Sequence, residues 1–108
     1  MRSVQLQVGV PVRVTGVSAA HWELARFELR VGHRLRPVKC GLVAAPGVAA
    51  DVFEAAGVPI PSDWRHHPGM RFDVVADVTP QEEGRFGHHG LQRWRLRVDR
   101  WVSVIVRE

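Results

Sequence analysis

Apolar and charged side chains alternate from Leu91 to Trp101, and this alternation restricts the fold more than any other feature of the sequence. Neighbouring side chains of a β-strand point to opposite faces, so the pattern predicts a strand that is buried on one side only. The apolar face would carry Trp94, Leu96 and Val98, and the polar face would carry Arg93, Arg95, Arg97 and Asp99. The arginines would stand in a row about 6–7 Å apart. That spacing resembles the spacing of phosphates along a nucleic-acid strand, but it equally suits a solvated strand face.

Arginine dominates the basic residues of this chain, which has 15 basic and 11 acidic side chains and a formal charge of +4. Lys39 is the only lysine. An arginine guanidinium binds phosphate through two parallel hydrogen bonds and stacks on aromatic rings, so the bias suits a nucleic-acid partner. A GC-rich coding sequence would produce the same bias, because alanine, glycine and valine are also abundant. Composition alone leaves both interpretations open.

Length and cysteine content limit the class of protein further. The chain of 108 residues suits a single domain over residues 1–108, with a core large enough to fold without cross-links. Cys40 is the sole cysteine, which excludes an internal disulfide framework and a cysteine-based zinc site and suits a reducing cytoplasm. Residues 1–8 alternate instead of forming an apolar run, so we expect no signal peptide. No segment is apolar enough to predict a membrane span.

Five segments are predicted to be strands and one is predicted to be a helix. The strands span Val4–Val14, Trp22–Val31, Leu35–Val43, Met70–Thr79 and Leu91–Trp101, with the last continuing to Val106. Gly9 and Pro11 predict a bend within the first strand. The helix spans Pro46–Ala56, where apolar residues recur at helical spacing and Gly57 follows as a stop. The polar segment Pro80–Gly90 is predicted to be a hairpin loop.

The order of these elements resembles an OB-fold, a partly open five-stranded Greek-key barrel. We therefore expect an all-β chain with one short helix between the third and fourth strands, and another small barrel or sandwich is the alternative. The segment Pro68–Val74 looks like the start of the fourth strand in bacterial single-stranded DNA-binding proteins. The chain length and element order are similar to the primosomal replication protein N relatives of that family. The resemblance implies that oligonucleotides bind across strands two and three, beside the loops that join strands one to two and four to five.

Single-strand binding proteins hold the nucleic-acid backbone with basic side chains and stack bases on aromatic rings. The residues expected to do this here are Arg13, Trp22, Arg26, Arg30, Arg34, Arg36, Lys39, Arg85, Phe86 and His88. Two of these assignments have structural alternatives. Trp22 could cap the open end of the barrel, and the arginines of the second strand could pair with Glu23 or Glu28. The arginine row of the last strand lies off the expected face and would make secondary contacts or a subunit interface.

No combination of side chains in the sequence indicates catalysis or a cofactor. Asp73 and Asp77 would share a strand face but lie about 13 Å apart, which is too far for acid–base catalysis on one bond. The histidine pairs at 66–67 and 88–89 match no metal-binding spacing. We therefore expect a protein that is not an enzyme, without catalytic residues, metal or cofactor.

The sequence thus favours a cytoplasmic protein that binds single-stranded nucleic acid, DNA above all, with little sequence preference, in replication, repair or DNA transfer. The apolar segment Val102–Val106 would promote association if it were uncovered, so a homodimer or larger assembly is expected. Trp101 breaks the parity of its strand and is a candidate for that interface. Replication or transfer proteins are further candidate partners.

The alternative function is an OB-like protein-interaction module that docks a partner protein without binding nucleic acid. One feature separates the two hypotheses. Arginines that converge with aromatic side chains on one groove favour nucleic-acid binding, whereas arginines interleaved with acidic residues favour protein interaction.

Overall fold

The computed structural model describes residues 5–20, 28–31, 38–86 and 90–107. Its strands are β1 (Val12–Ala20), β2 (Glu28–Val31), β3 (Val38–Ala44), β4 (Met70–Phe86) and β5 (Gln92–Arg107). The α-helix α1 (Val52–Ala56) and a short 3-10 helix (Trp64–His66) lie between β3 and β4. The order of strands and α-helix is the predicted one, and the 3-10 helix is an addition to it.

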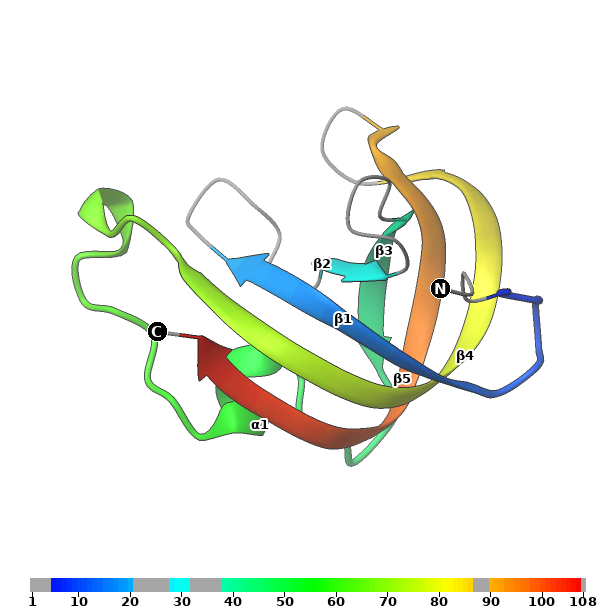
Figure 1. The fold of residues 1–108 in the computed structure, drawn as a ribbon, viewed down its shortest axis with the longest axis horizontal. Coiled ribbons are helices and arrows are strands. Elements are labelled where there is room, and N and C mark those ends of the chain that lie inside the picture. The colour runs from blue at the N-terminus through cyan, green and yellow to red at the C-terminus, as the bar shows by residue number, and fades with distance from the viewer. Residues whose placement is uncertain (1–4, 21–27, 32–37, 87–89, 108) are drawn as a thin grey trace.

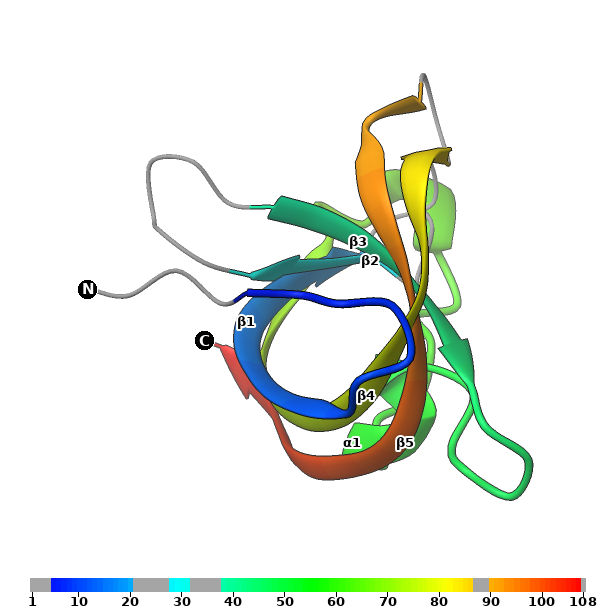
Figure 2. The ribbon, with the colours of Figure 1, turned by 90° about the vertical axis from the view of Figure 1, so that its right-hand side faces the viewer.

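The five strands close into a barrel in the order β1-β2-β3-β5-β4, with β4 returning to pair with β1 (Figures 1 and 2). Neighbouring strands are antiparallel except β3 and β5, which run parallel. Every strand has two partners, although parts of some strands pair on one side only, such as residues 100–107 of β5, which pair with β4. The structure confirms the expected all-β, OB-like barrel with one short helix between β3 and β4.

The barrel interior is filled by apolar side chains that alternate along each strand. The predicted inward positions are buried at Leu29, Val31, Cys40, Leu42, Phe72, Val74, Ala76, Val78, Leu96 and Val98. The helix adds Phe53, whose ring packs edge-to-face on Phe72 with 5.1 Å between the ring centroids. The Asp51 carboxylate accepts the Glu54 N–H at 3.0 Å and so caps the helix start, and Gly57 ends the helix at a φ of 68°.

The first strand lies further along the chain than the predicted Val4–Val14. Its inward parity is as predicted, but it continues through small residues that suggested a loop, namely Gly16, Ser18 and Ala20. Residues 5–11 form no strand, and Val8 is 60% exposed. The chain turns at Gly9, which has a φ of 80° and whose N–H donates to the Pro80 carbonyl at 2.8 Å. The predicted range was wrong because period-two alternation also runs through this exposed, non-strand segment.

The described parts of β2 and β3 agree with the predicted strands, and the rest of those two predictions, residues 22–27 and 35–37, lies outside the described residues. The helix is shorter than the predicted Pro46–Ala56 and begins at Val52. Its start was misplaced because Asp51 provides the cap, whereas the Val48 N–H closes a turn onto the Ala45 carbonyl at 3.0 Å.

The predicted loop Pro80–Gly90 is mostly strand, because β4 continues to Phe86. Pro80 pairs with Leu96 and Phe86 pairs with Gln92, and a register shift follows Pro80. A proline is accepted beside such a bulge because the ladder is already interrupted there. Residues 81–86 and 92–95, here called the arm, pair with each other at the far end of the β4–β5 ladder from the start of β4, and Trp94 and Arg95 also pair with β3 (Figures 1 and 2). The β4 half of the arm was missed because residues 81–85 are polar or glycine and show no apolar alternation.

The end of β5 is not an uncovered apolar tail. Residues 103–107 pair with β4, and Val104 and Val106 pack against the core. Register shifts between Val75 and Ala76 and between Asp77 and Val78 add residues to β5, which explains the broken parity of Trp101. The Trp101 indole is half-buried and donates to the Ala49 carbonyl at 2.8 Å. The main reason for expecting an oligomer was therefore wrong, although Ile105 remains 61% exposed.

Gly16 is expected to be required for the close approach of β1 and β2. An ideal Cβ at Gly16 would overlap the Arg30 carbonyl oxygen, which is main chain and cannot rotate away. We expect Gly16→Ala to reduce the free energy of unfolding by about 1–3 kcal/mol, measured by urea denaturation. The matched control is Gly84→Ala on the arm, where the Cβ would meet only the Phe86 ring tip at 3.1 Å. A Gly16→Ala protein as stable as this control would contradict the tight approach.

Candidate nucleic-acid interface

Two basic side chains stand directly opposite each other on the outward face of β2 and β3. Arg30 and Lys39 are register partners, while their neighbours Leu29 and Cys40 face the core and are fully buried. Both basic residues are half-buried in the sheet surface. Like charges directly across a ladder repel each other, and the register places these two cationic side chains next to each other on this face. This is the face that an OB-fold offers to oligonucleotides.

Several predicted binding residues lie outside the described part of the chain. These residues are Trp22, Arg26, Arg34, Arg36 and His88. They remain predictions, and Arg30 and Lys39 are the predicted binding residues that the structure describes on this face.

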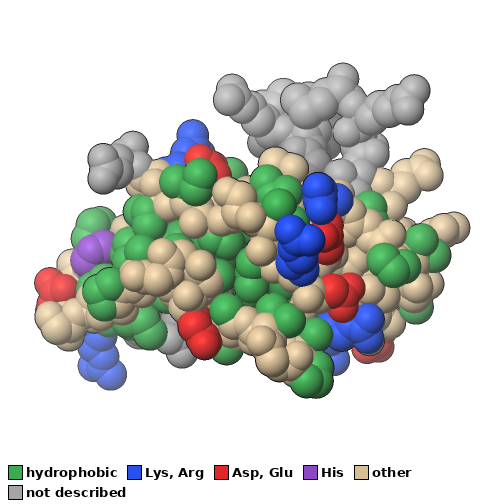
Figure 3. Space-filling model, turned by 90° about the horizontal axis from the view of Figure 1, so that it is seen from below, with side chains coloured by type: hydrophobic (Ala, Val, Ile, Leu, Met, Phe, Trp, Pro, Cys, Tyr) green, Lys and Arg blue, Asp and Glu red, His purple; other side chains and the backbone are tan. Residues whose placement is uncertain are grey.

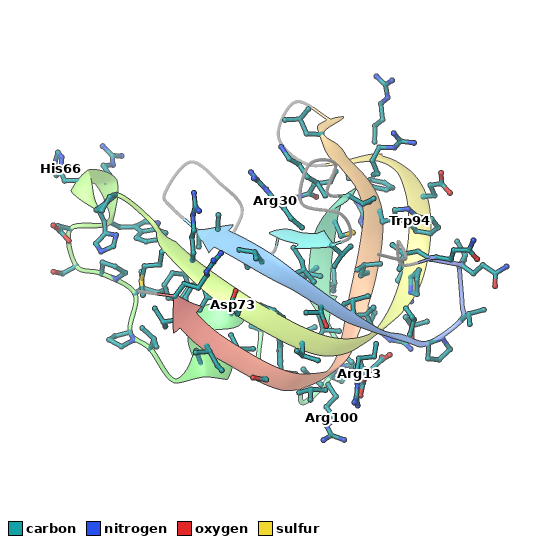
Figure 4. The ribbon with its side chains drawn as sticks, viewed as in Figure 1. Arg13, Arg30, His66, Asp73, Trp94 and Arg100 are labelled. Carbon is teal, nitrogen blue, oxygen red and sulfur yellow. The ribbon has the colours of Figure 1, made fainter. Side chains whose placement is uncertain are left out.

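The structure does not bring Arg13 to this face. Arg13 is the register partner of Asp77 on β4 and donates to both of its carboxylate oxygens, at 2.8 and 3.2 Å. These hydrogen bonds raise the pKa of the Arg13 guanidinium and lower the pKa of the Asp77 carboxyl. Arg13 lies beside Arg100 on the lower side of the barrel in Figure 4, whereas Arg30 lies above β1. Arg13 therefore belongs to a different surface from Arg30.

Arg85 and Phe86 lie on the arm, where Arg85 is exposed and Phe86 is half-buried. The Arg95 guanidinium carbon stands 4.5 Å from the centroid of the Phe86 ring, a cation–π contact. Sequence reasoning placed Phe86 in a loop and Arg95 in the arginine row, so it missed this pair. Only the register of the arm brings the two together. A ring held beside a guanidinium is a surface on which a nucleobase can stack.

The outer arginine row of β5 is exposed, as predicted, but acidic residues are interleaved with it. Arg97 donates to the Asp99 carboxylate at 2.7 Å, and Arg95 lies 3.9 Å from the Glu82 carboxylate. Figure 3 shows basic and acidic side chains next to each other on the lower face, with hydrophobic side chains between them. Such a surface repels phosphates at each carboxylate. The row therefore resembles a solvated or protein-binding face more than a track for a nucleic-acid backbone.

Neither a metal centre nor a membrane segment is evident in the described ranges. No group of three or more histidine, cysteine, aspartate or glutamate side chains there could hold a metal ion. Within the same residues, none of the helices is long and apolar enough to cross a membrane.

Fold and site together define a small OB-like barrel with opposed basic residues on the β2–β3 face. Comparison with models of known protein families, with curated proteins and with solved structures found no match. The likeness to single-stranded DNA-binding proteins therefore remains a prediction from the pattern of elements.

The pH dependence of stability is expected to report the Asp99 site. The Thr79 hydroxyl donates to the Asp99 carboxylate at 2.6 Å, and this bond, followed by the contact with Arg97, lowers the pKa of Asp99. A lowered pKa in the folded state means that the interaction stabilises the protein above the unfolded pKa of about 3.9. That stabilisation is lost as the pH falls through the lower, folded pKa.

Urea denaturation of wild type and Asp99→Asn at pH 7 and at pH 3 tests this expectation. The variant should be less stable at pH 7, and the difference should shrink at pH 3. The control is Asp63→Asn, because the side chain of the exposed Asp63 makes no capping hydrogen bond to the 3-10 helix. A difference between Asp99→Asn and wild type that is equal at both pH values would argue against a charge-dependent site.

Proposed function

We propose that this chain is a non-enzymatic, cytoplasmic protein that binds single-stranded nucleic acid, DNA above all, across the outward face of β2 and β3. The observation that carries the proposal is the direct opposition of Arg30 and Lys39 on that face of an OB-like barrel. Work in replication, repair or DNA transfer would suit such binding.

Electrostatics explains why a phosphate backbone suits this position. Arg30 and Lys39 share one ladder rung, so a phosphate placed between them would accept charge-assisted hydrogen bonds from both. Binding of this kind releases counterions from the nucleic acid and does not read the base sequence. Low sequence preference follows from this mode of binding.

The barrel holds this basic pair in place through its backbone. The Arg30 carbonyl lies so close to Gly16 that a side chain between them would clash, so β2 is held tightly against β1. On its other side β2 pairs with β3 along all four of its residues. A rigid face presents its charges at a fixed separation, so less conformational entropy is lost when a strand of nucleic acid binds.

The arm supplies a second contact region for the same ligand. Arg85 is exposed there, and Phe86 with Arg95 offers a ring and a guanidinium for base stacking. This role fits the OB-fold pattern, in which the connection between strands four and five flanks the binding face.

A protein-interaction module is the second candidate function, and the outer face of β5 favours it. Arg95 and Arg97 each have a carboxylate neighbour there, in Glu82 and Asp99. Mixed charge of this kind suits a complementary protein surface better than a polyanion. A homo-oligomer stays a prediction, which now rests on the exposed Ile105 of the same strand. Replication or transfer proteins likewise remain proposed partners.

Fluorescence anisotropy of a labelled oligo-dT of about 30 nucleotides tests the proposed face, with salt varied from 50 to 200 mM. The double variant Arg30→Gln/Lys39→Gln should bind more weakly, and its salt slope should fall by about 1.4, since each phosphate contact to a single strand contributes about 0.7. The control Arg13→Gln/Arg100→Gln removes the same charge from the lower side of the barrel. Equal losses in both variants would indicate non-specific attraction and contradict a defined face.

Trp22→Ala in the same assay tests the predicted stacking residue. Loss of one stacked base should reduce the binding free energy by about 1–3 kcal/mol without changing the salt slope. An unchanged affinity would remove Trp22 from the site. If wild-type protein failed to bind at 50 mM salt, nucleic-acid binding itself would be wrong, and a protein partner should be sought instead.

A further inference from the structure

A hollow of about 550 Å³ lies at the end of the barrel where β4 begins and β5 ends. It is lined by His67, Gly69, Met70, Arg71, Val106 and Arg107. Figure 1 shows this region beside the C-terminus and the 3-10 helix, at the opposite end of β4 from the arm, and His66 and Asp73 mark its surroundings in Figure 4. The hollow is therefore separate from the arm of the proposed nucleic-acid interface.

Two arginines oppose each other across the mouth of this hollow. Arg71 and Arg107 are register partners at the last rung of the β4–β5 ladder, and both are exposed. The Asp73 carboxylate lies 3.7 Å from the Arg107 guanidinium, whereas Arg71 makes no ion pair with any residue that the structure describes. Among the described residues, one carboxylate thus accompanies the two guanidinium groups. Opposed like charges on a ladder repel each other, so an anion bound between them would be favoured.

His67 adds a hydrogen-bond donor, and its hydrogen bond to Gly69 shows which ring nitrogen that donor is. Its Nδ1 accepts the Gly69 N–H at 3.1 Å, so the neutral ring must carry its hydrogen on Nε2. The ring also packs against Trp64, with 6.1 Å between the ring centroids, which limits its rotation. With Nδ1 accepting from Gly69, the ring offers Nε2–H as a donor.

The rest of the lining is apolar, and none of it is acidic. Met70 and Val106 are half-buried and pack against the hydrophobic core, so they form a firm base to the hollow. Two guanidinium groups and an imidazole donor beside an apolar surface are the groups that bind a phosphate ester, because its charged and apolar parts each find a partner.

We propose that this hollow is a binding site for a phosphate group on an organic ligand. Arg71 and Arg107 hold the phosphate oxygens, His67 Nε2 donates a further hydrogen bond, and the carbon part of the ligand rests on Met70 and Val106. The phosphate belongs either to a small ester or to the end of a nucleic-acid strand. The site rests on its own residues and does not depend on the proposed β2–β3 interface.

NMR titration of the full chain with inorganic phosphate, at constant ionic strength maintained with chloride, tests the site. Saturable shifts are expected at the amides of Gly69, Arg71 and Arg107. The variant Arg71→Gln/Arg107→Gln should bind phosphate at least about tenfold more weakly, because charge-assisted hydrogen bonds are lost. The control Arg100→Gln removes an exposed arginine of the same strand and should leave the titration unchanged.

The folded state provides a second check, because both arginines are exposed and repel each other. The double variant should melt at a temperature no lower than wild type, so weaker phosphate binding could not be attributed to unfolding. The proposal is overturned if wild type shows no saturable shifts at these amides, or if Arg100→Gln weakens binding as much as the double variant does.

The source of the phosphate is distinguished with two oligo-dT probes that differ only in a 5′-phosphate. Tighter binding of the phosphorylated probe, lost in Arg71→Gln/Arg107→Gln, would assign the site to a nucleic-acid end. Equal binding of both probes, alongside saturable binding of inorganic phosphate, would assign it to a small phosphate ester. Because the first titration contains no nucleic acid, failure of the β2–β3 interface and failure of this site give different results.

Discussion

Pairing between the 17-residue β4 and the 16-residue β5 is the interaction on which the rest of this structure depends. Its middle part supplies much of the core, including Phe72 and Leu96. Its register shifts bend and twist the two strands, which lets β4 reach β1 and β5 reach β3 on the other sides. One end of the ladder extends as the arm, and the other end opposes Arg71 and Arg107. The register of β4 against β5 therefore determines the closure of the barrel, the position of the arm and the opposition of the two arginines at the other end.

The placement of carboxylates decides which arginines of this basic chain could meet an anion. Arg13 is held by Asp77, and Arg97 is held by Asp99. Arg30 stands opposite Lys39 on the β2–β3 rung, so the register of that rung places two basic side chains together. The proposed nucleic-acid interface would use this pair to hold a phosphate backbone. The register partner of each arginine is thus more informative for the proposed function than the net charge of +4.

Side-chain parity was the most predictable feature of the chain, and strand ends were the least. Phe72, Val78 and Val98 face inward as expected, because alternation reports directly which face of a strand is buried. The strand ends were predicted wrongly where the apolar alternation of the sequence does not coincide with the strand pairing of the structure. Val8 keeps the pattern although it lies in an exposed segment, and Pro80 lies within a strand because β5 pairs across it. Pairing partners are not encoded in any local window of sequence.

The sequence by itself determined the fold class, the inward-facing residues and the identity of the basic side chains, because each depends on local periodicity or composition. The tertiary structure alone decided which charges meet. Arg13 was assigned to the binding face from its place on the first strand, yet the register of β1 against β4 sets it beside Asp77. The contact of Phe86 with Arg95 and the opposition of Arg71 and Arg107 likewise depend on how β4 pairs with β5. A shift of one residue in that register would turn these side chains to the opposite face, so no reading of either strand alone could have placed them.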